Sequence, residues 1–177
     1  MGWKVIANRE TMPAMAGVAA KELLVEKLVT ALRAERDTAD RLARDTAEAA
    51  NHPEARPEND KDTRKLELSY LAQGQAARAR ELDATIATLV AQPPRVFGAG
   101  DAIALGALVE LESGDKLDRV LLCAGGGGTS IEDQLGPVRV VTPEAPLGRA
   151  LLGKTEGDEI ELVVAGKKRE LVVVSVA

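Results

Sequence analysis

The 177-residue chain is poor in aromatic residues, histidine and cysteine. Its aromatic side chains are Trp3, Tyr70 and Phe97, so a core must be built from leucine, valine, isoleucine and alanine. One histidine, His52, and one cysteine, Cys123, exclude a Cys/His zinc cluster and an internal disulfide. A Ser/His/Asp triad would have to use His52, which stands next to a proline. The sequence therefore argues against a zinc protein and against a triad hydrolase.

Long apolar runs and excess positive charge are also lacking. No segment is apolar over the length of a membrane span, and the start "MGWKVIANRE" has no apolar signal-peptide core. We therefore expect a cytoplasmic protein that has no membrane contact. The net charge of −5 argues against a dedicated nucleic-acid binder, because such surfaces are basic. It still allows a protein partner that itself holds nucleic acid.

Residues 13–92 carry a helical hydrophobic period that is interrupted once. In both runs apolar side chains recur at spacings of three and four, which is typical of a coiled-coil seam. In the first run the predicted seam contains Val25, Leu28, Leu32, Ala39 and Leu42. In the second run it contains Leu68, Leu71, Leu82, Ile86 and Leu89. The pattern predicts an antiparallel two-helix hairpin, about 45 Å long at a rise of 1.5 Å per residue.

The interruption between the two runs is rich in proline and acid. Pro53 and Pro57 cannot both lie inside a helix, so the first helix should end just before Pro53 and the second begin near residues 58–62. The acids of this tip, near residues 52–62, include Glu54, Glu58, Asp60 and Asp62. A solvated turn explains such a cluster on charge alone. Carboxylates at the end of a long arm are also hard oxygen ligands that suit Mg²⁺.

Beyond "QPPR" the hydrophobic period changes to two and β-branched residues become frequent. The candidate strands span residues 102–112, 118–124, 138–142, 158–166 and 169–176. A short helix fits residues 145–153, with Gly153 as its C-terminal stop. Residues 95–177 are therefore predicted to form a small α+β domain with a curved antiparallel sheet and one short helix. Residues 1–12 form an N-terminal arm to which the sequence assigns no role.

The run "CAGGGGTS" raises the possibility of a phosphate-binding loop. A P-loop has a lysine after its last glycine, whereas Gly128 is followed by Thr129 and Ser130. Strand patterns flank the run on both sides. It therefore predicts a loop that is flexible or closely approached by other atoms. Cys123 is expected to be a small buried hydrophobic residue.

The stretch "VTPEAPLGRALLGKTEGDEIEL", residues 141–162, resembles the C-terminal signature of the GreA/GreB transcript cleavage factors. The resemblance is carried by Pro146, Arg149, Leu151, Gly153, Lys154, Gly157 and Asp158. Ala145 stands where the family usually has serine. The resemblance implies a coiled-coil hairpin followed by an FKBP-like antiparallel β domain. It also implies that the protein binds bacterial RNA polymerase through the concave face of this domain, with Pro146, Arg149, Lys154 and Asp158 as candidate contacts.

In that family the hairpin enters the secondary channel of the polymerase, and acids at its tip help to hold the second catalytic Mg²⁺. The polymerase then hydrolyses the 3′ end of a backtracked transcript by two-metal chemistry. The resemblance therefore implies a factor that is not itself an enzyme and has no cofactor of its own. It would use the Mg²⁺ of the polymerase active site and meet nucleic acid only within the elongation complex. We expect a monomer.

The tip departs from the family pattern. Glu58 and Asn59 align with the family tip, but Ala55 occupies the position of its aspartate. The metal-binding pair is Glu54 with Glu58, or Asp60 with Glu58, with Asp62 just beyond, or the pair is lost. A lost pair predicts a non-cleaving factor that inhibits or modulates the polymerase from the same channel. A remote alternative is a peptidyl-prolyl isomerase, which the lack of aromatic pocket walls disfavours.

Overall fold

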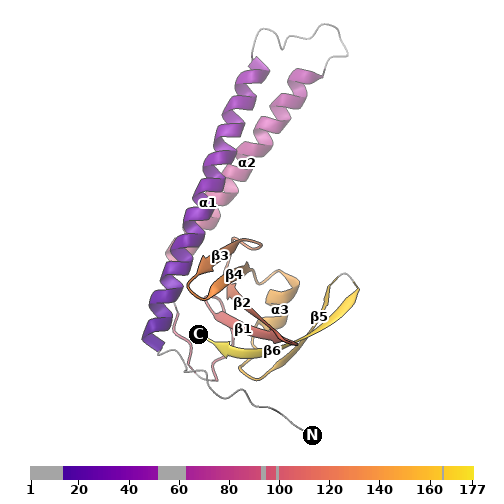
Figure 1. Cartoon of the computed structure of the whole chain (residues 1–177). Helices are drawn as coiled ribbons and strands as arrows, with labels where there is room; N and C mark the ends of the chain where they lie inside the picture. Colours follow the sequence, from indigo (N-terminus) through magenta and orange to yellow (C-terminus); the bar gives the residue numbers. More distant parts are fainter. Residues whose placement is uncertain (1–13, 52–62, 93–94, 99, 165) are drawn as a thin grey trace.

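The computed structural model describes residues 14–51, 63–92, 95–98, 100–164 and 166–177. Two long helices form an arm, and a six-stranded sheet with one short helix lies against the base of that arm (Figure 1). The predicted fold class, a helical hairpin followed by a small α+β domain, is confirmed. The predicted N-terminal arm, residues 1–12, lies outside the described residues.

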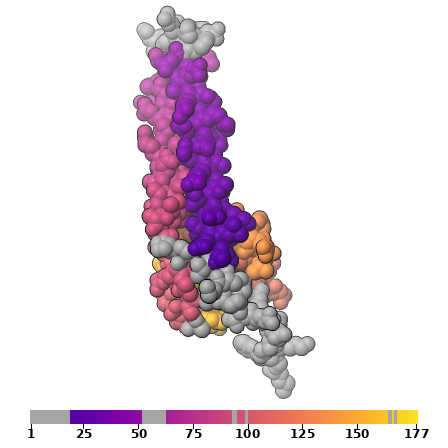
Figure 2. Space-filling view, turned by 90° about the vertical axis from the view of Figure 1, so that its left-hand side faces the viewer, coloured from indigo at the N-terminus to yellow at the C-terminus, as the bar shows by residue number. Residues whose placement is uncertain are grey.

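The arm consists of α1 (Ala14–Asn51) and α2 (Arg64–Ala91). The described part of α2 starts slightly later than predicted. Thr63 precedes it, and its carbonyl oxygen accepts the first helical hydrogen bond from the Glu67 backbone N–H, at 2.9 Å. At a rise of 1.5 Å per residue, the 38 residues of α1 span about 57 Å. Figure 2 shows the pair as a narrow column that rises clear of the sheet domain.

The interior of the arm changes along its length. Near the domain, large aliphatic side chains meet across the seam, with Leu28 and Leu32 of α1 buried together with Ile86 of α2. Toward the distal end the buried side chains are alanines: Ala39, Ala43, Ala50, Ala72 and Ala79. Ion pairs flank the seam, and Arg78 Nη2 lies 2.7 Å from Glu35 Oε1. The base of the arm therefore buries much more apolar volume than its outer half.

Two of the leucines predicted for the seam lie outside it. Leu42 is 45% exposed and Leu71 is 53% exposed, so this part of the prediction was wrong. Their neighbours Ala43 and Ala72 are buried instead. One residue along an α-helix turns by about 100°, so a one-position error moves a side chain from the seam to its flank. Hydrophobicity alone predicted that the leucines lie in the seam, but the helix geometry places the alanines there.

The sheet has the strand order β3-β4-β2-β1-β6-β5. Its strands are β1 (Leu108–Ser113), β2 (Lys116–Leu122), β3 (Ser130–Asp133), β4 (Gly136–Val141), β5 (Glu159–Val164) and β6 (Lys167–Val176). Neighbouring strands are antiparallel except β2 and β4, which pair in parallel. That pair is parallel because β3 intervenes in sequence and lies at the sheet edge, outside β4.

Two strand predictions need correction. The strand predicted for residues 102–112 begins only at Leu108, because residues 103–107 form irregular structure that bonds elsewhere. Ile103, for example, exchanges backbone hydrogen bonds with the segment 153–154, its N–H donating to the Lys154 carbonyl at 2.7 Å. Strand β3 was missed altogether, because four residues with a single buried side chain, Ile131, give too short an alternating pattern.

The sheet packs on both of its faces. One face lies against the base of the arm, where Leu108, Leu121 and Val140 join the leucines of α1 and α2 in one buried cluster. The other face is covered by α3 (Pro146–Leu151), whose Leu147 and Leu151 pack against strand residues of a second cluster. Because the first cluster contains residues of both units, the arm and the sheet share one core.

The glycine run forms the turn where the sheet meets the arm. A Cβ at Gly125 would lie 2.5 Å from Thr85 Cγ2 of α2, and one at Gly126 would lie 3.0 Å from Leu28 Cδ1 of α1. Gly126 also has a φ of +75°, a conformation that side chains rarely adopt. The close approach predicted for this run is confirmed, and its glycines let the loop contact both helices.

Candidate functional site

The four acids assigned to the tip lie outside the described residues: Glu54, Glu58, Asp60 and Asp62. The structure describes the helix ends that carry them. Asn51 ends α1 and Arg64 begins α2, both at the end of the arm farthest from the sheet (Figure 1). Residues 52–62 therefore join the helices at that end. Which of the acids form a pair stays a prediction.

Two predicted contact residues lie on the short helix α3. Pro146 occupies its first turn and Arg149 its last, and both are exposed. The opposite side of α3 is buried and includes Gly148, where a Cβ would lie 2.0 Å from the Thr142 carbonyl oxygen. Because Gly148 has no side chain, α3 can pack directly on the preceding turn. Proline and arginine are thus presented outward by a helix whose position is fixed by close packing.

Lys154 and Asp158 lie in the turn that connects α3 to β5. The Asp158 carboxylate accepts hydrogen bonds from the Thr155 backbone N–H at 2.8 Å and the Thr155 hydroxyl at 3.3 Å. The backbone hydrogen bond from Thr155 is the main reason that the pKa of Asp158 is lowered. Lys154 is half-buried, and its carbonyl oxygen anchors Ile103. Asp158 therefore has a structural role in this turn, whatever its role toward a partner.

A buried lysine at the base of the arm was missed by the sequence analysis. Lys21 is 2% exposed, donates to the carbonyl oxygen of Arg95, and has its Nζ 4.9 Å from the centroid of the Phe97 ring. Burial lowers the pKa of Lys21. Its burial could have been predicted from the sequence, because Lys21 stands one heptad before Leu28 and therefore at a seam position. The lysine ties α1 to the segment that leads into the sheet.

A charged cluster supports the sheet beside the arm. Arg119 Nη1 lies 2.5 Å from Asp133 Oδ1, and this hydrogen bond is the main reason that the pKa of Asp133 is lowered. Arg119 also lies 4.0 Å from Glu110, which accepts a hydrogen bond from the Ser175 hydroxyl at 2.9 Å. From α1, Lys27 Nζ donates to the carbonyl oxygen of Glu132 at 2.5 Å. These contacts hold β3 against both the sheet and the arm.

The described residues show neither a metal cluster nor a membrane helix. Within them, no group of three or more His, Cys, Asp or Glu side chains is arranged to hold a metal ion. No helix of this described part is long and apolar enough to cross a membrane.

The fold defines a protein with a long two-helix arm carried on a small sheet domain. Residues 99–177, just under half of the chain, match the family model described as "Transcription elongation factor, GreA/GreB, C-term". The sheet domain is therefore similar to the C-terminal domain of the GreA/GreB transcription elongation factors. The resemblance predicted from residues 141–162 is confirmed.

Solved structures give weaker comparisons. Gfh1 (GreA factor homolog 1) of Thermus thermophilus is 22% identical, with 86% of this chain and 94% of that chain covered and a TM-score of 0.36. Gfh1 of Thermus aquaticus is 23% identical, with coverages of 85% and 92% and a TM-score of 0.37. The GreA/GreB factor of Nitrosomonas europaea is 20% identical, with coverages of 54% and 78% and a TM-score of 0.34. These TM-scores are too low to carry an argument. A comparison with curated proteins gave no match.

Proposed function

We propose that this protein is a cytoplasmic, monomeric elongation factor that binds bacterial RNA polymerase and stimulates cleavage of backtracked RNA. Its arm enters the secondary channel, and its tip acids assist the second catalytic Mg²⁺. The family match of residues 99–177 carries the proposal, because it links the sheet domain to transcription elongation. The protein is then not an enzyme and has no cofactor of its own, since the nuclease is the polymerase.

The shape of the arm supports insertion into a channel. Its α1 helix spans about 57 Å, far more than a sheet of this size needs as cover. The side chains buried in its outer half are small, as at Ala43 and Ala72, whereas leucines fill the seam near the sheet. A long two-helix arm, which Figure 2 shows as a narrow column, is suited to carry a few side chains into a confined site.

The chemistry of the tip residues fits the same proposal. Carboxylates are preferred Mg²⁺ ligands, and Mg²⁺ binds most readily where other anionic groups already hold it. A polymerase active site with an RNA 3′ end supplies such groups. Glu58, with Glu54, Asp60 or Asp62, would complete the coordination of the second metal. The two metals of such a site would supply an activated water and stabilisation of the leaving oxygen.

A transcript cleavage assay on a stalled elongation complex tests this proposal. We expect wild-type protein to shorten backtracked RNA, and the triple variant Glu58→Ala, Asp60→Ala, Asp62→Ala to lose at least about 100-fold in rate because the metal loses its carboxylate. The variant should still compete with wild-type protein for the polymerase. Normal cleavage by the triple variant would show that these acids have no role.

The second candidate is a non-cleaving factor that occupies the same channel. It is favoured by Ala55, which stands where the family has its tip aspartate. Wild-type protein that binds the polymerase and leaves backtracked RNA intact would establish this function. An isomerase is disfavoured further by the environment of Phe97, since that ring is 5% exposed and covered by Lys21. It does not line an open pocket.

Binding to the polymerase is assigned to the sheet domain. Pro146 and Arg149 are exposed on α3, and Lys154 lies in the next turn. A truncated arm is a poor test of this assignment, because removal of the sheet would expose the leucines that share its core. We expect the variant Arg149→Glu to keep the fold, because Arg149 is exposed, and to weaken polymerase binding without altering the tip.

A further inference from the structure

One face of the sheet is only partly covered by the arm. Side chains two residues apart on a strand share a face, so Leu108, Glu110 and Glu112 of β1 all point to the side on which the arm packs. Leu108 lies in the core shared with the arm, Glu110 is half-buried, and Glu112 is exposed. Beyond Glu110 the face therefore continues past the edge of the arm, over β1, β6 and β5.

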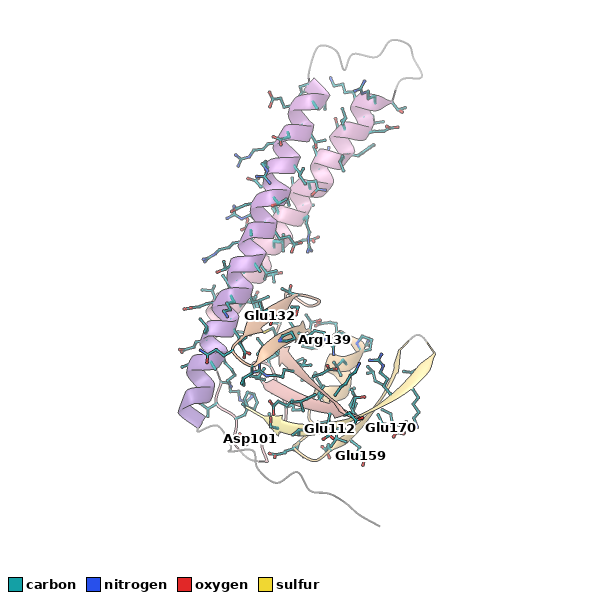
Figure 3. The ribbon with its side chains drawn as sticks, viewed as in Figure 1. Asp101, Glu112, Glu132, Arg139, Glu159 and Glu170 are labelled. Atoms are coloured by element: carbon teal, nitrogen blue, oxygen red, sulfur yellow. The ribbon has the colours of Figure 1, made fainter. Side chains whose placement is uncertain are left out.

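Strand register places the residues of this uncovered part side by side. Leu117, Glu112, Val172 and Glu159 are successive partners across β2, β1, β6 and β5. The next rows pair Glu161 with Glu170 and Val163 with Lys168. Figure 3 shows Glu112, Glu159 and Glu170 gathered at one end of the sheet, away from Glu132 beside the arm. We call this surface the acidic sheet face; it consists of Leu117, Glu112, Val172, Glu159, Glu161, Glu170, Val163 and Lys168.

The like charges of the acidic sheet face destabilise the isolated domain. Glu161 lies directly opposite Glu170, and like charges in that position destabilise a sheet. Lys168 Nζ lies 2.5 Å from Glu161 and 4.0 Å from Glu170, so one lysine serves both. In the described part of the chain, neither Glu112 nor Glu159 has an ion pair.

Apolar side chains lie among these glutamates. Val172 is 37% exposed, Leu117 is 38% exposed and Val163 is 68% exposed. In the register each lies beside a charged partner: Val172 between Glu112 and Glu159, Leu117 opposite Glu112, and Val163 opposite Lys168. A partner could therefore bury apolar surface here and neutralise the surrounding carboxylates at the same time.

The negative charge of the acidic sheet face indicates which kind of partner would bind there. Nucleic acid and anionic lipid would be repelled by four glutamates against one lysine. A second copy docked by two-fold symmetry would bring the same glutamates face to face. A protein segment that carries lysine or arginine next to apolar side chains fits both features of the surface.

We propose that the acidic sheet face docks a basic segment of the partner protein. The inference rests on the proposed function, in which that partner is RNA polymerase. The face lies on the side of the sheet opposite to α3, so it is a second contact, separate from the one assigned to Pro146 and Arg149. Two contacts on opposite faces would fix the direction in which the arm points.

The test compares charge reversals on and off this face in the full-length protein. Glu112→Lys with Glu159→Lys reverses two charges on the acidic sheet face, and Glu22→Lys with Glu26→Lys makes the same change on exposed residues of α1. Binding to core RNA polymerase is measured for both, with circular dichroism to show that each protein is folded. We expect the first variant to bind about tenfold more weakly at low salt and the control to bind like wild type.

Salt concentration and a neutral variant test whether the loss of binding is electrostatic. The loss should shrink between about 0.05 M and about 0.5 M salt, because screening weakens the interaction, and Glu112→Gln with Glu159→Gln should lose less. Equal binding by the reversal and the wild type, or equal losses in reversal and control, would refute the acidic sheet face as a docking site. If wild-type protein itself fails to bind the polymerase, the proposed function falls and this inference falls with it.

Discussion

Cys123 and Lys21 are both buried, and burial acts on their pKa values in opposite directions. It raises the pKa of the Cys123 thiol to about 11, from 9.0, and it lowers the pKa of Lys21. In each case a low-polarity environment disfavours the charged form. Cys123 therefore remains a thiol at neutral pH, and it serves as a packing residue in the core shared by arm and sheet.

Native protein should resist thiol reagents. At about pH 8 we expect Cys123 to react with a disulfide reagent at least about 100-fold more slowly than in denatured protein, because the thiolate is scarce and the residue is 4% exposed. Absorbance of the released thiol measures both rates, and the denatured sample gives the reference rate. Rapid stoichiometric labelling of the folded protein would show that this core opens readily.

The same thiol makes stability depend on alkaline pH. Its folded pKa of about 11 exceeds the ordinary value of 9.0, so the folded state retains the proton longer than the unfolded state. The free energy of unfolding should therefore fall as pH rises from 9.0 toward 11, by up to about 1.4 kcal/mol per unit. Urea titrations of wild type and Cys123→Ala would isolate this term, because other groups titrate equally in both.

At the scale of the element, the arm shows why hydrophobic content does not identify a helix seam. Leu32 and Leu42 are equally apolar, yet Leu32 is 3% exposed and Leu42 is 45% exposed. The seam turns around the helix with a fixed period, and Ala39 and Ala43 are the residues that this period brings inward. Their small side chains pack in the outer half of the arm, while the leucines support the half near the sheet.

The two leucines should respond differently to truncation. We expect Leu32→Ala to lower the free energy of unfolding by about 2–5 kcal/mol, because it leaves a cavity between the arm and the sheet. Leu42→Ala should cost less than about 1 kcal/mol, because its side chain is already half in water. Chemical unfolding followed by circular dichroism measures both. Similar losses in the two variants would contradict the assignment of the seam.

At the scale of the whole molecule, the junction between the sheet and the arm sets the direction of the tip. The glycine loop contacts α1 and α2, Lys21 holds the segment at Arg95, and Lys27 reaches β3. The arm is therefore fixed to the domain that would bind the partner, and a motion of the domain would be transmitted to the tip.

A pair of substitutions tests the fit at this junction. Gly125→Ala should cost about 1–3 kcal/mol, because its Cβ would lie 2.5 Å from Thr85 Cγ2. Thr85→Ala removes that methyl group, so the double variant should recover most of the loss. Unfolding free energies of the wild type, both single variants and the double variant form the cycle. Additive losses would show that the two residues do not meet.

Much of this organisation was predictable from local patterns. The two helices, the strands predicted at residues 118–124, 138–142, 158–166 and 169–176, and the turn at Gly153 were confirmed in the described residues, because each depends on residues close in sequence. Strand β3, the parallel pairing of β2 with β4 and the burial of Lys21 were not predicted. The parallel pairing and the burial of Lys21 depend on contacts between segments far apart in the chain, whereas β3 is too short to show an alternating pattern.

By itself the sequence determined the two-part architecture, the family signature at residues 141–162 and the acids available at the tip. Periodicity, turn residues and side-chain chemistry are local properties, and a single chain displays them directly. Only the tertiary structure decided that the glycine loop meets both helices, and that Glu112 and Glu159 flank Val172 on an uncovered face. Such neighbours are set by strand register and by the packing of arm on sheet, which no local pattern encodes.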